Sequence, residues 1–237
     1  MSGTDDVAPS VVLAELARDL HAESECGVEA VAPRIARAAT DVIEAVEFVG
    51  VTLMEGDEVR STVRSDDVAE QFDRLQQEAG EGPGLDAVRV GRIVHAPDLT
   101  SDGRWPELAA LVDEKSPVRS ALSFELSTRR QGLGALTLTS TNVDGFSDAD
   151  VERGYALAAH AALAVDAARR HEQFRNALAS RDVIGQAKGV IMERFAVDDG
   201  RAFELLRELS QSTNISVAEI SRRLTADVGQ SADSAKS

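Results

Sequence analysis

The stretch from Asp148 to Phe195 contains no proline, and this restricts the fold more than any other feature of the chain. Without a proline to break it, and with glycines such as Gly154 and Gly189 as its weak positions, the sequence predicts one continuous helix across it. Its alanine-rich middle carries apolar residues at three-four spacing, namely Leu157, Ala161, Ala164 and Ala168, followed by His171. This spacing is typical of a coiled coil, so we expect a homodimer through the helix. A single long helix that packs only within its own chain is the alternative.

The segment from Arg181 to Leu224 contains three short amphipathic helical patterns, the first at the end of the long helix. Their apolar residues are Ile184, Ala187 and Ile191, then Ala202, Leu205, Leu206 and Leu209, then Val217, Ile220 and Leu224. No single helix can bury such a stripe alone. Asp198 and Asp199 precede the second helix, and Ser216 with Glu219 predicts a capping box at the third. The pattern predicts a compact three-helix bundle.

Three motifs in this segment keep their order and spacing over many positions. They are Arg181-x-x-Ile184-x-Gln186-Ala187-Lys188-Gly189-x-Ile191-Met192-x-Arg194, then Ala202-Phe203-x-x-Leu206-Arg207, then Ser210-Gln211-x-x-Asn214. Together they resemble an ANTAR domain, an RNA-binding antitermination module. The resemblance implies a dimer that binds paired stem-loops in a leader transcript and keeps a terminator hairpin from forming. Where the family usually has basic residues after the asparagine, this chain has Ile215 and Ser216.

The predicted RNA-binding residues are five cations, one amide and one glycine: Arg181, Gln186, Lys188, Gly189, Arg194, Arg222 and Arg223. Arg181, Lys188 and Arg194 lie seven and six residues apart, close to two turns each, so we expect a cationic ridge for phosphates. Gln186 would address base edges and Gly189 would allow close approach. Arg222 and Arg223 would substitute for the missing basic residues.

The alternative to an RNA-binding ridge is an ordinary solvent-exposed helix face, since residues 174–228 carry eight basic and eight acidic side chains. Such a neutral module is not an obvious nucleic-acid binder from composition alone. Ala187 and Phe203 are predicted to be core residues rather than contacts.

The N-terminal part of the chain mixes helical and strand patterns. Helices are predicted at 11–20, 28–42, 67–79, 85–90 and 106–114, and strands at 47–54, 58–65, 92–96, 120–128 and 134–140. Gly56 and Asp57 predict a hairpin turn between the first two strands. The order is a helix, a hairpin, inserted helices, three further strands and the long helix.

Short motifs recur within this order: Glu81-Gly82-Pro83, the stretch from Gly91 to Asp98, Arg104-Trp105-Pro106, Arg119-Ser120, Gly134-Ala135-Leu136 and Phe146-Ser147-x-x-Asp150. The order and motifs resemble a GAF sensor domain. The resemblance implies an α+β fold, with a GAF-type antiparallel sheet flanked by helices and joined by the long helix to the all-α bundle. It also implies a small-molecule ligand between the sheet and the inserted helices.

The sequence names no cofactor for this domain. Asn142, Phe146 and Asp150 match fragments of a cyclic-nucleotide pattern, but the expected lysine is missing, and we interpret them as a turn and helix cap. His95 and His160 are candidate haem ligands, yet a lone histidine without a second ligand pattern is more often packed or exposed.

The net charge of −16 must lie upstream of the neutral C-terminal module, which argues against membrane surfaces and non-specific nucleic-acid binding by the N-terminal part. No apolar run approaches the roughly 20 residues of a membrane helix, and the first ten residues lack a cleavable signal pattern. We therefore expect a cytoplasmic protein without a membrane partner. No glycine loop, metal-spaced pair or catalytic triad stands out, so we expect a non-enzyme.

These observations predict four parts: a leader and helix at 1–25, a GAF-like sensor domain at 26–167, an ANTAR-like RNA-binding domain at 168–228 and a flexible tail at 229–237. The predicted function is a signal-responsive RNA-binding regulator that prevents transcription termination. One alternative is a DNA-binding regulator with Arg222 and Arg223 in a major groove. The other is a protein-interaction sensor whose bundle has lost RNA binding.

Overall fold

The computed structural model describes residues 27–55, 58–91, 93–128 and 131–234. The predicted leader, the helix at 11–20 and the hairpin turn at Gly56 and Asp57 lie outside the described residues. The chain divides into two compact units between His171 and Glu172, and each is described by itself.

The first unit is built on a five-stranded antiparallel sheet with the strand order β2-β1-β5-β4-β3. The strands are β1 (Phe48–Glu55), β2 (Glu58–Arg64), β3 (Val94–Ala96), β4 (Ser120–Ser127) and β5 (Gly132–Ser140). The central strands β4 and β5 are buried along almost their whole length, which explains their nearly continuous apolar and small-residue sequence. The predicted strands are confirmed, with bounds shifted by one or two residues.

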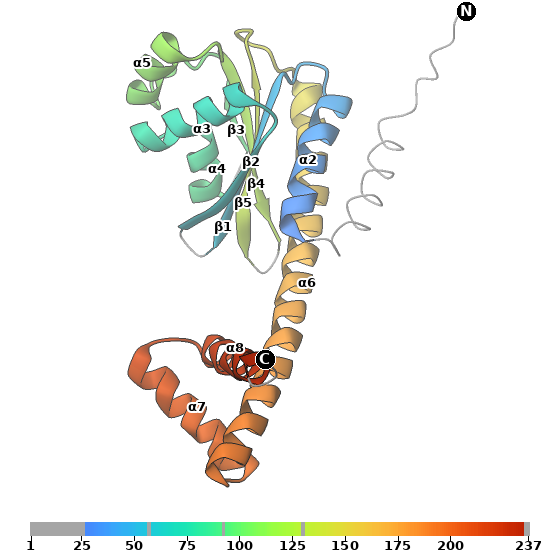
Figure 1. Cartoon of the computed structure of the whole chain (residues 1–237). Helices are drawn as coiled ribbons and strands as arrows, with labels where there is room; N and C mark the ends of the chain where they lie inside the picture. Colours follow the sequence, from blue (N-terminus) through green and yellow to red (C-terminus); the bar gives the residue numbers. More distant parts are fainter. Residues whose placement is uncertain (1–26, 56–57, 92, 129–130, 235–237) are drawn as a thin grey trace, which may run out of the picture. The chain divides into compact units, whose positions relative to one another are not determined.

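Helices cover both faces of this sheet (Figure 1). One face carries α2 (Val28–Val42) and the first part of α6 (Asp148–Phe195). The other carries α3 (Asp67–Ala79), α4 (Pro83–Val90) and α5 (Pro106–Lys115). Side chains alternate between two cores: Leu122 and Phe124 of β4 face α2 and α6, whereas Ala121 faces the other three helices. The α+β fold expected from the sequence is confirmed.

The long helix α6 is continuous from Asp148 to Phe195, as predicted. The apolar stripe expected to form a coiled coil is, however, buried in the first unit, where Leu157, Ala161 and Ala168 pack in the core shared with α2 and the sheet. For these residues the alternative, packing within their own chain, is correct, and their side chains are not available to a second copy. Different side chains of α6 are exposed: Phe174 by 63% and Leu178 by 46%.

The second unit consists of the end of α6, α7 (Asp199–Thr213) and α8 (Val217–Ser234). Its small core contains residues from all three helices, namely Ala187, Ile191, Ala202, Leu206 and Ile220. The bundle predicted from the three apolar stripes is thereby confirmed. Helix α8 continues to Ser234, past the position where the sequence suggested a flexible tail.

Capping residues define the helix starts in this unit. The Asp198 side chain accepts a hydrogen bond from the Arg201 amide at 2.8 Å, as expected for an N-cap. Ser216 accepts one from the Glu219 amide at 3.2 Å, which is half of the predicted capping box. In the bonds described for this turn, the Glu219 carboxylate binds Arg222 and Arg223 rather than the Ser216 backbone.

Phe203 was predicted to be a core residue, and this is wrong: its side chain is 43% exposed. It follows the buried Ala202 by one residue, which rotates it by about 100° around α7, away from the core. Among the described residues, no helix combines the length and apolar character that crossing a membrane requires.

Candidate nucleic-acid interface and sensor core

The predicted contact residues on α6 do not share one side of the helix. Arg181 and Lys188 are seven residues apart, about 1.9 turns, so they project from the same side. Arg194 follows Arg181 by thirteen residues, about 3.6 turns, which places it nearly opposite. The cationic ridge therefore has two members, and the expectation that Arg194 belongs to it is wrong. Gln186 is also exposed, and Gly189 has nothing within 4 Å of the position that a Cβ would occupy.

Lys188 is engaged within the unit. Its ammonium forms an ion pair with the carboxylate of Asp199, the first residue of α7, and the lysine side chain is only 21% exposed. The pair links α6 to the start of α7. Because the Asp199 side chain is 70% exposed, solvent screens the attraction, and an external phosphate can compete for the ammonium.

Arg222 and Arg223 on α8 bind the same carboxylate. Arg222 donates to Glu219 Oε2, and Arg223 donates to Glu219 Oε1 at 3.0 Å. The hydrogen bond from Arg223, with the charge of Arg222, holds the pKa of Glu219 below its usual value. The two cations proposed for RNA contact are thus already partly neutralised by their own helix.

A group of exposed polar and aromatic side chains on α7 was not predicted as a site. Phe203, Arg207 and Gln211 recur at intervals of four residues, and Asn214 ends the helix in the left-handed region with φ 55°. All four are exposed. Their positions stood in the sequence motifs, but the apolar character of Phe203 led to its interpretation as core.

Beneath α3 and α4 the sensor unit buries an unusual polar cluster. Asp73 is 5% exposed and Gln76 is 4% exposed, and Gln76 Nε2 donates to Asp73 Oδ1 at 3.4 Å. Gln76 Oε1 accepts from the Gly84 amide at 2.8 Å, which fixes the start of α4. A Cβ on Gly84 would stand 3.0 Å from Thr137 Oγ1, so this helix lies tightly on the sheet. The glycines after Glu81 therefore serve close packing.

Arg64 stands beside Asp73 without satisfying it completely. Arg64 Nε lies 3.6 Å from Asp73 Oδ2, and both atoms are buried without a hydrogen-bond partner. Burial raises the pKa of Asp73 to about 6, although the Arg64 charge opposes this shift. The contact is therefore an ion pair without a hydrogen bond.

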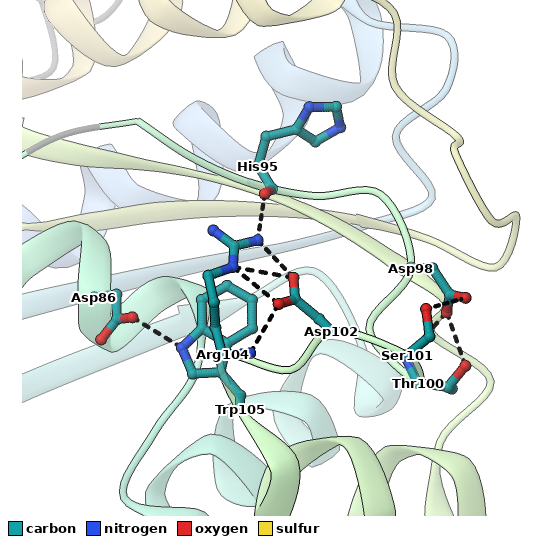
Figure 2. A network of polar contacts seen from close by, with 8 residues as sticks. All are labelled: Asp86, His95, Asp98, Thr100, Ser101, Asp102, Arg104 and Trp105. Carbon is teal, nitrogen blue, oxygen red and sulfur yellow. Dashed lines mark hydrogen bonds and ion pairs between the residues drawn. The ribbon is translucent and has the colours of Figure 1, made fainter.

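A polar network fixes the loop between β3 and α5 (Figure 2). Arg104 binds the Asp102 carboxylate through Nε at 2.9 Å and donates to the His95 carbonyl at 2.6 Å. Its guanidinium lies 4.2 Å from the centroid of the Trp105 ring, and Trp105 Nε1 donates to Asp86 Oδ2 at 2.8 Å. The hydrogen bond from Arg104 lowers the pKa of Asp102. The Arg104-Trp105-Pro106 motif thus anchors α5 to α4.

Of the residues considered as ligand contacts, His95 has an unpartnered ring nitrogen and Asp150 forms a helix cap. The His95 ring points away from the network in Figure 2, and its Nε2 is buried without a hydrogen-bond partner. Asp150 Oδ2 accepts from Ser147 N at 3.0 Å and Ser147 Oγ at 2.7 Å, which confirms the predicted helix cap. No group of three or more histidine, cysteine, aspartate or glutamate side chains in the described part could hold a metal ion.

The chain thus combines a sheet covered on both faces with a separate helical unit that exposes cations and an aromatic ring. The chain belongs to the GAF-domain family, whose model matches residues 27–166, and an ANTAR domain matches residues 172–224. An ANTAR domain implies RNA-binding antitermination regulation, and a GAF domain implies sensing. This is a regulatory architecture rather than an enzymatic one.

Solved structures show the same sensor fold at low identity. The free methionine-R-sulfoxide reductase of Neisseria meningitidis, solved with its substrate, is 18% identical, with a TM-score of 0.51 over 72% of this chain and 96% of that chain. A GAF sensor protein described as putative from Burkholderia vietnamiensis is 15% identical, with a TM-score of 0.52 over 69% and 99%. The GAF domain of an Acinetobacter phosphoenolpyruvate-protein phosphotransferase is 14% identical, with a TM-score of 0.51 over 72% and 97%. These likenesses concern the fold alone. No curated protein matches the chain.

Proposed function

We propose that this protein is a signal-responsive antiterminator that binds paired stem-loops in leader RNA and keeps a terminator hairpin from forming. The match of residues 172–224 to the ANTAR domain carries the proposal. The exposed Arg181 and the adjacent Lys188 support it, because two cations on one helix side suit a phosphate backbone. Leader RNA is bound while it is being transcribed, so the proposal places the protein in the cytoplasm.

The seven predicted contact residues take different parts in this proposal. Arg181 and Lys188 hold phosphates, and Gly189 leaves room for the RNA to approach. Arg222 and Arg223 exchange Glu219 for phosphate when RNA binds. Gln186 and Arg194 lie on other sides of α6 and would contact a different part of the RNA.

Paired stem-loops call for two binding units, so the proposal includes a homodimer. The exposed Phe174 and Leu178 lie four residues apart on α6 and supply the apolar contact. Met192, which is exposed on the same side, lies fourteen residues after Leu178, two heptads further along.

The sensor acts through α6, whose first part packs in the GAF core. An effector between the sheet and α3 or α4 would change RNA binding only if it binds one arrangement of the dimer more tightly than another. Domain limits of 26–167 for the sensor and 168–228 for the RNA-binding part belong to the same proposal. The proposal assigns no catalytic step and no cofactor.

Titration of the full chain with a two-hairpin RNA tests the function directly, with a scrambled-loop RNA as the control. Arg181→Ala should weaken binding and reduce the slope of log affinity against log salt by about 1, because one phosphate contact is lost. Arg181 is exposed, so the variant should unfold at the same temperature as the wild type. Equal RNA affinity of the variant and the wild type would contradict the assignment of Arg181. A wild type that prefers duplex DNA at matched salt would favour the DNA-binding alternative instead.

A further inference from the structure

The exposed surface of α7 has two adjoining sides of different chemistry. On one side, Arg201 Nη1 binds both Glu204 at 3.0 Å and Glu208 at 3.1 Å. On the other side lie Phe203 and Arg207, four residues apart and separated by about 40° around the helix. Arg201 therefore balances Glu204 and Glu208, which lie about 100° and 140° around the helix from Phe203.

The side with Phe203 is cationic and aromatic. Arg207 is exposed, and within the described part of the chain neither Glu204 nor Glu208 pairs with it, because both are held by Arg201. The acid that precedes Phe203 by four residues is Asp199, whose charge is balanced by Lys188. An incoming anionic ligand meets an unbalanced guanidinium next to an aromatic ring.

Two amide side chains extend this surface. Gln211 follows Arg207 by one further interval of four, and Asn214 closes the helix, and both are exposed. Amides offer a donor and an acceptor together, which is what the edge of a nucleobase requires. Aromatic rings and guanidinium planes stack on unpaired bases in RNA loops. A ring, a planar cation and two amides along one helix side thus match the chemistry of an unpaired base.

A protein partner fits this surface less well. Interface cores depend on several apolar side chains that become buried together. Phe203 is the one large apolar residue on this side, because Leu209 lies on the other side of α7 and lines an apolar pocket with Ile220 and Leu224. The surface has too little apolar area for a stable protein contact and enough for one stacked base.

We propose that Phe203 and Arg207, with Gln211 and Asn214, form the surface that recognises an unpaired base in the RNA loop. The inference rests on the proposed function and names the residues that read the loop, whereas Arg181 and Lys188 hold the backbone. Stacking on the Phe203 ring releases no ions, so the contribution of Phe203 should be insensitive to salt, unlike the phosphate contacts.

The test compares full-chain variants with the two-hairpin RNA over a range of salt concentrations. Phe203→Leu keeps an apolar side chain without a ring and should weaken binding roughly tenfold with the salt slope unchanged. Phe203→Tyr keeps the ring and should bind like the wild type. With 2-aminopurine in the loop, wild-type protein should quench the fluorescence at one position, and Phe203→Leu should abolish that quenching.

Arg207→Ala should also weaken loop-dependent binding, and its control combines Arg201→Ala with Glu204→Gln and Glu208→Gln, which removes the whole ion-paired group. The control removes a cation from the same helix, about 120° around it from Arg207, without releasing unpaired acids, so it should leave discrimination between the native and the scrambled loop unchanged. Wild type that binds hairpin RNA while Phe203→Leu binds equally well, with equal quenching, would overturn this inference and leave the proposed function standing. Loss of the dimer in Phe203→Leu, with equal RNA affinity at matched dimer concentration, would show a protein contact instead. Failure of the wild type to bind hairpin RNA would overturn both proposals.

Discussion

At the scale of single residues, Asp73 is a carboxylate of the sensor unit that is buried with one oxygen lacking a hydrogen bond. It lies almost fully buried between α3 and the sheet, with Arg64 close by but no hydrogen bond between them. Burying a carboxylate favours its protonated form, and the Arg64 charge offsets only part of that preference. The folded state therefore binds a proton at this site more tightly than the unfolded chain does.

This preference predicts a dependence of stability on pH. The folded pKa of about 6 lies above the ordinary value of 3.8, so the contribution is fully present below about pH 4 and is lost as pH rises through 6. The change is at most about 3 kcal/mol, since each unit of pKa corresponds to about 1.4 kcal/mol. Urea unfolding at pH 4.5, 5.5 and 7 should show the wild type losing stability relative to Asp73→Asn. Parallel curves for the two proteins would rule out Asp73 as the titrating group.

At the scale of elements, α6 serves two environments along its length. Leu157 is fully buried in the sensor core, whereas Leu178 is 46% exposed in the second unit. Exposed apolar residues on a helix stabilise the folded monomer little, but they lose contact with water when a second helix covers them.

Two substitutions on α6 should therefore have different effects. Leu178→Ser should weaken the proposed dimer and leave the melting temperature of the monomer nearly unchanged. Leu157→Ala should destabilise the fold by about 2–5 kcal/mol, as for other buried leucines. Sedimentation and thermal unfolding, measured on both variants, separate the two effects. A Leu178→Ser protein that dimerises as tightly as the wild type would place the interface elsewhere.

Elements were also the scale at which the sequence was most informative. The predicted bounds of α3 agree with the structure because Asp66 caps its start and Gly80, in the left-handed region, ends it. The end of α6 agrees for a related reason: the apolar pattern breaks at Phe195, just before the capping Asp198. Helix ends of this kind can be predicted because they depend on residues that are adjacent in the sequence.

Contacts between residues distant in the sequence could not be predicted from the sequence pattern. Three-four spacing showed that Leu157 and Ala161 share a side, but not whether the sheet or a second copy covers it. The ion pair between Lys188 and Asp199 and the burial of Asp73 depend on tertiary contacts that no local motif specifies. Phe203 was misassigned because apolar character alone does not distinguish a core residue from an exposed one.

At the scale of the whole molecule, dimerisation and RNA binding should influence each other. Phe174 and Leu178 are followed on the same side of α6 by Arg181 and Lys188, at the three-four spacing that a parallel pair of helices would bring together. Like charges would then face each other across the pair and oppose it. A polyanion placed over these cations would relieve the repulsion.

The dimer should therefore tighten when hairpin RNA is added and also when salt is raised without RNA. The dissociation constant of the RNA-free dimer, measured by sedimentation at about 50 and 300 mM salt, should fall at the higher concentration. The Debye length drops from above about 10 Å to below about 8 Å over this range, so the cations repel each other less. Arg181→Gln should show a smaller response to salt. A dimer that weakens as salt rises would mean that attraction between opposite charges holds it together.

The internal pairing of cations in the ANTAR unit has a consequence for how the protein searches for its target. Lys188, Arg222 and Arg223 each bind a carboxylate of their own unit. Under the proposed function, a transcript with few well-placed phosphates would gain little free energy by displacing those carboxylates, so the protein should bind bulk RNA only briefly. Only a ligand that offers both clustered phosphates and a well-placed loop would compensate for the loss of these ion pairs. Under the proposed function, this near-neutral module would bind few of the other transcripts in the cell and would stay available for a rare leader during its transcription.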